Sequence, residues 1–160
     1  YPELRPNLFE PSMIIPRTEE NYIIVNRTQR YQNIYVDYSI LENYKNVYFV
    51  GVEKEFKALR NHNPNIEHLV VDNFYQLAQW IAGSKLFIGN QSMAFAIAEQ
   101  LKVNRVLEQF VHAPNVIPQG GLYWVTHNNN QFKSAIESAL SGSENTNQGS
   151  TQNKETETSN

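Results

Sequence analysis

Three short polar segments carry the side chains of this sequence that are best suited to bind a charged or polar ligand. Each segment follows a run of apolar residues, namely runs 22–25, 47–50 and 86–88. Two arginines in the first segment suit a diphosphate, because each guanidinium offers a planar fork of donors and keeps its charge. A carboxylate in the second segment suits a ribose diol. The candidate binding residues are Arg27, Thr28, Arg30, Glu53, Asn90, Gln91 and Ser92.

Ser92 in the third segment predicts the start of a helix that could hold an anion. It directly precedes a stretch with apolar residues at helical spacing, from Phe95 to Leu101. A serine at this position caps a helix, because its hydroxyl accepts from the first free amides. The start of a helix also carries a partial positive charge and commonly binds phosphate. A tight strand-to-helix connection that binds no ligand would account for the same residues.

The charged candidates also have purely structural explanations. The two arginines fit a solvated loop in which they pair with nearby carboxylates. Those carboxylates would be Glu19, Glu20 or Asp37. Glu53 fits as an acid in the first turn of a helix, where the helix dipole favours a negative charge. The sequence leaves the binding and the structural explanations open.

Apolar runs alternate with segments of helical periodicity along most of the chain. The expected strands are residues 22–25, 47–50, 68–71, 86–88, 105–107 and 122–125. The expected helices are residues 38–44, 53–61, 74–82, 93–101 and 131–140, and Gly83 is expected to cap the third of them. Strands that are apolar on both faces are typical of a parallel sheet. The alternation therefore predicts an α/β fold: a Rossmann-like, doubly wound, mostly parallel sheet of about six strands with helices on both faces.

In such a fold the segments that follow the strands meet at the carboxyl edge of the sheet, which is where ligands bind. The candidate binding residues would therefore face one common crevice. Five further polar residues follow the expected strands and are expected at the same edge, namely Asp72, Asn73, Glu108, Gln109 and His112.

The composition excludes several classes of function. The chain of 160 residues is 41% hydrophobic, enough for a globular core, and its net charge of -3 without a basic stripe disfavours nucleic acid. The absence of cysteine excludes disulfides and thiolate metal sites and fits a cytoplasmic protein. The histidines show no ligand spacing, so we expect no metal. No apolar run approaches the ~20 residues that span a bilayer.

The ends of the chain differ in composition from its middle. Residues 1–20 are rich in proline, which predicts an extended linker between two domains. Residues 21–140 contain all the expected strands and helices and are expected to form one Rossmann-like domain. Residues 141–160 have no large apolar side chain, which predicts a disordered polar tail. The first residue, Tyr1, lies inside the expected linker, which favours a fragment of a longer protein.

The stretch from Leu77 to Ser92, LAQWIAGSKLFIGNQS, resembles a segment of the heptosyltransferase-type (family 9) glycosyltransferases. In their carboxyl-terminal domain a hydrophobic helix, Ala-Gly-Ala, an apolar strand and Gly-Asn-Asp-Ser-Gly precede a helix that contains a histidine. The resemblance extends in element order over about residues 22–140, but its specific motif is Gly-Asn-Gln-Ser. Gln91 stands where the family has aspartate, Met93 where it has a second glycine, and Ala96 near its histidine.

The resemblance implies one half of a GT-B fold, which consists of two Rossmann-like halves with the sugar nucleotide held mainly by the second. This chain would be that second half. Gln91 and Ser92 would meet the donor diphosphate, residues 27–30 would hold phosphate, and Glu53 would contact the ribose. The catalytic base of the family lies in the other half. A methionine where glycine allows close approach leaves less room for a phosphate.

The expected function is therefore the binding of a nucleoside-diphosphate sugar by the donor half of a metal-independent glycosyltransferase, with no cofactor besides this substrate. The expected partners are the nucleotide sugar, a glycan acceptor and an absent amino-terminal domain, without which the chain should not catalyse transfer. One alternative is a non-catalytic GT-B-like module that binds a glycan or a protein. Another is half of a different GT-B-shaped enzyme, such as a sugar-nucleotide epimerase or a polysaccharide pyruvyl transferase.

Overall fold

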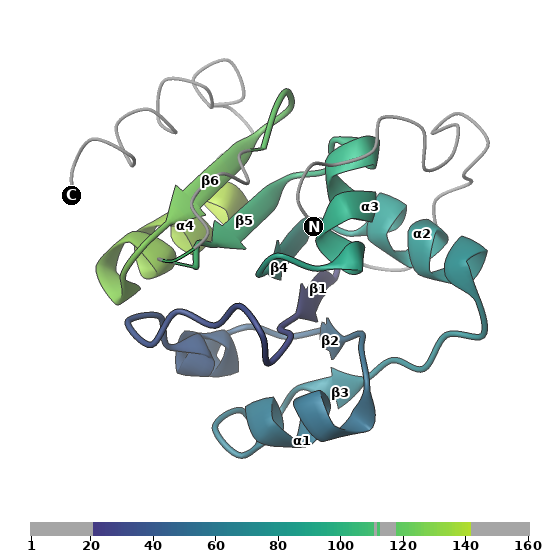
Figure 1. Ribbon diagram of the computed structural model, residues 1–160, viewed down its shortest axis with the longest axis horizontal. Coiled ribbons are helices and arrows are strands. Elements are labelled where there is room, and N and C mark those ends of the chain that lie inside the picture. Colours follow the sequence, from purple (N-terminus) through teal and green to yellow (C-terminus); the bar gives the residue numbers. More distant parts are fainter. Residues whose placement is uncertain (1–20, 111, 113–117, 142–160) are drawn as a thin grey trace.

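A parallel β-sheet forms the centre of the protein in the computed structural model, which describes residues 21–110, 112 and 118–141. Within these residues the sheet has six strands in the order β3-β2-β1-β4-β5-β6, and every neighbouring pair is parallel. Figure 1 shows the strands from β3 at one end of the sheet to β6 at the other. The strands are β1 (Ile23–Asn26), β2 (Val47–Phe49), β3 (Glu67–His68), β4 (Leu86–Gly89), β5 (Arg105–Glu108) and β6 (Tyr123–Thr126).

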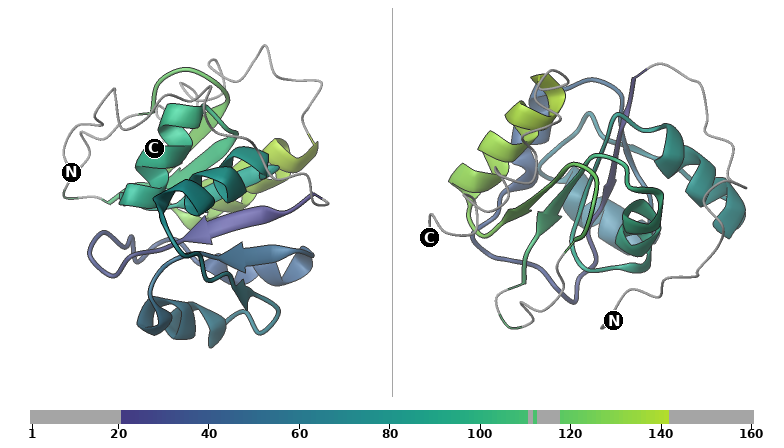
Figure 2. Two further views of the ribbon diagram at one scale, coloured as in Figure 1. Left: turned by 90° about the vertical axis from the view of Figure 1, so that its right-hand side faces the viewer. Right: turned by 90° about the horizontal axis from the view of Figure 1, so that it is seen from above.

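Helices cover both faces of the sheet, and each face has its own hydrophobic core (Figures 1 and 2). On one face lie η2 (Tyr38–Asn43), a 3₁₀ helix, α1 (Glu53–Arg60) and α4 (Asn129–Ser141). On the other face lie α2 (Phe74–Gly83) and α3 (Met93–Leu101). We call the α2/α3 side the first face of the sheet and the side of η2, α1 and α4 the second face.

The two cores follow from the alternation of side chains along each strand. In β1, Ile23 and Val25 belong to the core of the second face, whereas Ile24 belongs to that of the first face. Successive residues of a strand point to opposite faces, so a strand buried on both faces must be apolar at every position. This explains why the continuous apolar runs of the sequence form the central strands.

The direction in which the strands are added reverses at β1. The chain passes from β1 to β2 and β3 on one side and returns to β4, β5 and β6 on the other. Crossovers between parallel strands put the two flanking helices on opposite faces, which opens a crevice at the carboxyl ends of β1 and β4. The expected fold class, a Rossmann-like doubly wound α/β sheet, is confirmed.

Several expected boundaries were wrong. Strand β3 ends at His68, because residues 69–71 leave the ladder after the Leu69 amide has bonded to the Phe49 carbonyl. Gly83 is the last residue of α2 rather than its cap, and the capping residue is Ser84 in an extended conformation. Helix α4 begins at Asn129 and includes Ser141. The expected linker at residues 1–20 and the rest of the expected tail lie outside the described residues.

We predict that Gly89→Ala destabilises the protein. A Cβ at Gly89 would lie 2.5 Å from the backbone oxygen of Asn26, where β4 and β1 approach each other at the crevice. The contact is with main chain and cannot be relieved by a rotamer change, so we expect a loss of about 1–3 kcal/mol in the free energy of unfolding. Urea denaturation measures it. Gly83→Ala, at the last residue of α2, is the control and should be neutral or stabilising. Equal losses in both variants would contradict the prediction.

Candidate functional site

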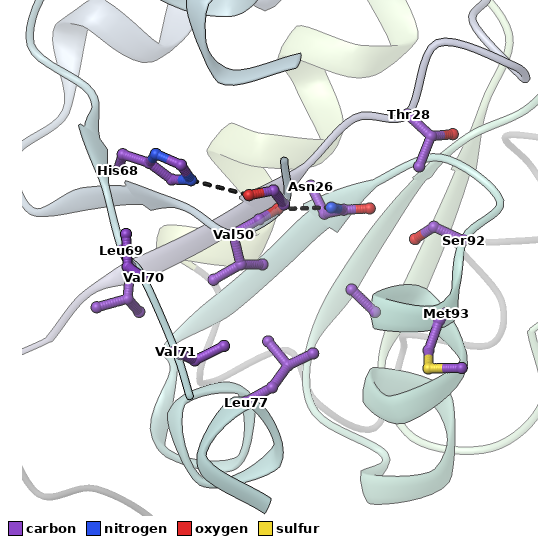
Figure 3. Close-up of a pocket in the computed structure, with 12 residues that line it drawn as sticks. Asn26, Thr28, Val50, His68, Leu69, Val70, Val71, Leu77, Ser92 and Met93 are labelled. Atoms are coloured by element: carbon purple, nitrogen blue, oxygen red, sulfur yellow. Dashed lines mark hydrogen bonds between the residues drawn. The ribbon is translucent and has the colours of Figure 1, made fainter. Parts of the chain in front are cut away.

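A pocket of about 360 Å³ lies at the crevice, on the first face of the sheet. It lies where the ends of β1, β2 and β4, the segment after β3, and the helices α2 and α3 come together (Figure 3). This volume lies within the range of small-molecule sites. The lining residues are Asn26, Thr28, Val50, Gly51, His68, Leu69, Val70, Val71, Leu77, Ser92, Met93 and Ala94.

Thr28 and Ser92 line one side of the pocket, and Asn90 fixes the position of Thr28. The Thr28 amide and hydroxyl both donate to Asn90 Oδ1, at 2.9 and 3.2 Å, and Asn90 Nδ2 donates to the Thr28 carbonyl at 2.8 Å. Asn90 is fully buried and does not itself line the pocket. It therefore joins the loop after β1 to the loop after β4.

Ser92 caps helix α3, as the sequence predicted. Its Oγ accepts from the Phe95 amide at 3.1 Å, and its carbonyl accepts from the Ala96 amide. The first amides of a helix have no acceptor within the helix. The amides of Met93 and Ala94 therefore come at the positive end of the α3 dipole, next to the pocket.

The opposite side of the pocket is apolar. Val50, Leu69 and Leu77 form its wall, and Val70 and Met93 lie at its mouth with 76% and 60% of their surface exposed (Figure 3). This wall was not predicted from the sequence, because residues 68–71 were assigned to a short strand. An apolar run of this length also fits a strand, so the sequence alone does not mark residues 69–71 as lining a pocket.

Asn26, at the end of β1, is a second residue that the sequence analysis missed. Its Nδ2 donates to the Val50 carbonyl at 2.6 Å, and only 5% of the residue is exposed. Its Oδ1 has no hydrogen-bond partner among the described residues and points toward the side of the pocket that holds Thr28 and Ser92 (Figure 3). A buried acceptor without a donor costs about 1–3 kcal/mol, so a ligand hydroxyl or amine would be favoured here.

Arg27 lies on the second face and does not line this pocket. Its Nε and Nη2 donate to Glu108 at 2.9 and 2.7 Å, and its guanidinium lies 4.6 Å from the centre of the Tyr38 ring. The sequence analysis expected Arg27 and Thr28 to face one common crevice, which is wrong. In the extended chain after β1, neighbouring side chains point to opposite faces. The partner of Arg27 is also Glu108 rather than Asp37.

Glu108 is completely buried at the end of β5 and accepts four hydrogen bonds. Besides the two from Arg27, Oε2 accepts from the Asn33 amide at 2.6 Å and Oε1 accepts from the Tyr38 hydroxyl at 2.8 Å. Burial on its own would lower the pKa of Arg27. The hydrogen bond to Glu108 and the nearby negative charge outweigh this effect and raise the pKa of Arg27. Burial, together with the negative charge of Glu108, raises the pKa of Tyr38 well above its ordinary value.

The remaining candidate residues lie apart from the pocket. Glu53 is exposed in the first turn of α1 and pairs with Lys57 at 3.1 Å, as the structural explanation predicted. Arg30 is exposed on the loop after β1, near the Tyr31 ring, and Gln91 is buried. Among the described residues, no three His, Asp or Glu side chains gather to hold a metal ion, and no helix is long and apolar enough to cross a membrane.

The sheet order and the crevice define a Rossmann-like fold of the kind that makes up GT-B glycosyltransferases. No family model matches the sequence, and no curated protein matches it. The structure is similar to that of ADP-heptose LPS heptosyltransferase II from E. coli, with a TM-score of 0.52 and 16% sequence identity. The match covers 79% of this chain and 49% of that chain, so this chain spans about half the length of that enzyme. The likeness confirms a glycosyltransferase-like fold, whereas the assignment to the carboxyl-terminal half stays a prediction.

We predict that Arg27→Met is strongly destabilising. It leaves the fully buried Glu108 carboxylate without its cation, and breaking a buried pair in this way costs about 3–5 kcal/mol. Urea denaturation at neutral pH measures the loss. The matched control is Lys57→Met, which breaks the exposed pair with Glu53 and should change stability by no more than about 0.5 kcal/mol. Similar effects of the two substitutions would show that Glu108 does not depend on Arg27.

We also predict that Tyr38 contributes to alkaline unfolding. Because the pKa of Tyr38 is raised in the folded state above its ordinary value of 10.0, the unfolded chain loses this proton first. Below about pH 10 the protonated Tyr38 makes its full contribution to the free energy of unfolding. This contribution is lost as the pH rises toward the pKa of Tyr38 in the folded state. Between about pH 8 and pH 11 the free energy of unfolding, measured in urea, should therefore fall less steeply with pH for Tyr38→Phe than for the unaltered chain. Tyr35→Phe, at an exposed position, should decline like the unaltered chain; identical curves for all three would contradict the prediction.

Proposed function

We propose that this chain binds the nucleoside-diphosphate part of a sugar donor in the pocket of the first face, as the donor-binding half of a metal-independent glycosyltransferase. One observation carries the proposal: a pocket at the reversal point of a Rossmann-like sheet has a capped helix start on one side and an apolar wall on the other. A nucleotide has the matching pair of features, an anionic diphosphate and a flat apolar base. The likeness to a heptosyltransferase in fold supports the choice of a sugar donor.

The polar groups of the pocket suggest how the donor lies. The diphosphate would accept from the amides at the start of α3, and Arg30 on the loop after β1 would supply a positive charge. The base would pack against Val50 and Leu77. Asn26 Oδ1 can only accept hydrogen bonds, so a ribose hydroxyl suits it and a phosphate oxygen does not. Arg27 and Glu53, which do not line the pocket, are left out of this site.

The chemical role of such a site is to stabilise negative charge on the departing diphosphate. The dipole of α3 and its first amides are fixed by the Ser92 cap before the ligand arrives, so little reorganisation accompanies the reaction. A base that deprotonates the acceptor hydroxyl would come from a second domain, and closure of the two domains would exclude water. The match to 49% of the heptosyltransferase chain is consistent with this division of labour.

A non-catalytic GT-B-like module is the second candidate function, and Met93 favours it. The Met93 side chain lies at the mouth of the pocket, at the first residue of α3, where the resembling family has glycine. A side chain at this position restricts how closely a phosphate can approach the helix start. In that case the pocket would hold a glycan or a segment of a protein rather than a nucleotide.

We predict that nucleoside diphosphates stabilise the protein and that Ser92→Asp abolishes this effect. Aspartate caps a helix as well as serine does, so α3 is retained, but its charge repels a diphosphate at the same amides. A thermal-shift panel of nucleoside diphosphates and their sugars measures binding, since a ligand at about 100 times its Kd adds ~2.7 kcal/mol of stability. Adenosine and inorganic diphosphate, tested separately, show which end of the ligand binds.

The control for this experiment is Asn73→Asp. Asn73 caps α2 on the same face by accepting from the Gln76 amide, but it does not line the pocket. It should bind nucleotides like the unaltered chain. If no nucleotide at millimolar concentration shifts the melting temperature, the non-catalytic GT-B-like module becomes the better explanation. If Ser92→Asp and the unaltered chain shift equally, the start of α3 is not part of the site.

A further inference from the structure

Among the described residues that line the pocket of the first face, His68 has the one ionisable side chain. The other lining residues are apolar or carry a neutral amide or hydroxyl group. Arg27 lies on the second face, and Arg30 and Glu53 are exposed outside the pocket. Histidine is the side chain that ordinarily changes its charge between about pH 5 and pH 8. A change in the charge of the pocket lining near neutral pH therefore comes from His68.

The hydrogen bond of His68 allows its ring to gain a proton without losing its place. His68 is the last residue of β3, and its Nε2 lies 2.8 Å from the Gly51 carbonyl oxygen (Figure 3). A carbonyl oxygen can only accept, so Nε2 carries a hydrogen in the neutral ring as well as in the charged one. Among the described residues Nδ1 has no hydrogen-bond partner. A second proton can therefore be added at Nδ1 while the bond to Gly51 persists.

Two aromatic rings pack against the imidazole of His68. The Phe56 ring of α1 stacks on it, with the ring centres 4.6 Å apart and the planes at 18°, and the Phe49 ring lies at 6.0 Å. The face of an aromatic ring attracts a cation, so both neighbours are compatible with a charged imidazole. Together with the bond to Gly51 they hold the ring at the pocket in either protonation state.

The charged side chains on the elements around His68 all lie outside the pocket of the first face. They are Glu53, Lys54, Glu55, Lys57 and Arg60 on α1, Glu67 on β3, and Asp72 on the segment after β3. Three of these groups already have partners within the protein, since Glu53 pairs with Lys57 and Glu55 accepts from the Gln29 amide. Exposed charges are screened by water and salt, whereas a charge on His68 is part of the pocket wall.

We propose that His68 makes the affinity of this pocket for an anionic ligand depend on pH, with the protonated ring favouring the diphosphate of a nucleotide sugar. The proposal rests on the function proposed for the pocket. Among the lining residues, protonated His68 is the one side chain that adds a positive charge to the dipole of α3. Salt screens charges over about 8 Å at physiological ionic strength, so this charge acts across a pocket of about 360 Å³. Affinity should therefore rise as the pH falls.

Isothermal titration of the full chain with ADP-glucose, UDP-glucose and GDP-mannose tests the proposal. Both phosphate groups of a nucleotide sugar keep their negative charges in this pH range, so the protein alone titrates. For a sugar that binds, we expect the Kd at about pH 5.5 to be at least about threefold lower than at about pH 8. The matching nucleoside, which lacks the phosphates, should show no such change.

The decisive variant is His68→Gln. Its side-chain amide can still donate to the Gly51 carbonyl but stays neutral, so binding at about pH 8 should persist while the rise in affinity at lower pH disappears. The matched control is His62→Gln, at an exposed position outside the pocket, and it should behave like the unaltered chain. A purely structural role of His68 would change the Kd by the same factor at both pH values. That result, or an unchanged pH dependence in His68→Gln, overturns the proposal.

NMR of the unaltered chain gives a second test that does not require a variant to fold. An anion that binds better to the charged ring must also favour its protonation, because the coupling of two binding events is reciprocal. The midpoint of the His68 titration, followed by its ring hydrogens, should therefore move to higher pH with the nucleotide sugar bound, and that of His62 should not. An unmoved midpoint overturns the proposal.

The same titrations separate this proposal from the function on which it rests. If a nucleotide sugar binds with equal affinity at both pH values, the role of His68 is wrong and the donor site stands. If none of the three binds at about 10 mM at either pH, both proposals are wrong.

Discussion

The burial of the Glu108 carboxylate is the constraint on which the carboxyl edge of the sheet depends. An ionised carboxylate loses several kcal/mol of solvation when it is buried, and only close positive charge and hydrogen bonds compensate for this loss. Here the compensation comes from Arg27 and Asn33 on the segment between β1 and η2, and from Tyr38 at the start of η2. The segment is therefore held against β5, although it lies far from β5 in the sequence. The segment also supplies Thr28 to the pocket of the first face.

The alternation of an extended chain explains why one segment serves two faces. Asn26 and Thr28 point to the first face and line its pocket, whereas Arg27 between them points to the second face. The same alternation places Val106 and Glu108 on the second face and Leu107 on the first. A polar segment after a parallel strand thus supplies ligand-binding groups to one side and a structural ion pair to the other.

The fold could be predicted from the sequence because its signals are local. Each central strand is an apolar run, and the cap of α3 requires Ser92 and the first residues of the helix alone. The site could be predicted less well, because its pairings are long-range. The sequence does not show that Arg27 meets Glu108, 81 residues away, rather than a nearby acid. Nor does it show that the apolar residues 69–71 leave the sheet and line a pocket.

The two attachments of the loop after β1 have a consequence for ligand binding. Asn90 holds Thr28 from the side of β4, and Glu108 holds Arg27 from the side of β5. Ordering a flexible loop around a ligand costs conformational entropy, which weakens binding. In this protein that entropy has already been lost on folding, so a ligand in the pocket of the first face meets a wall that is in place before it arrives. Weakening the buried ion pair would therefore reduce affinity even at a pocket that Glu108 does not touch.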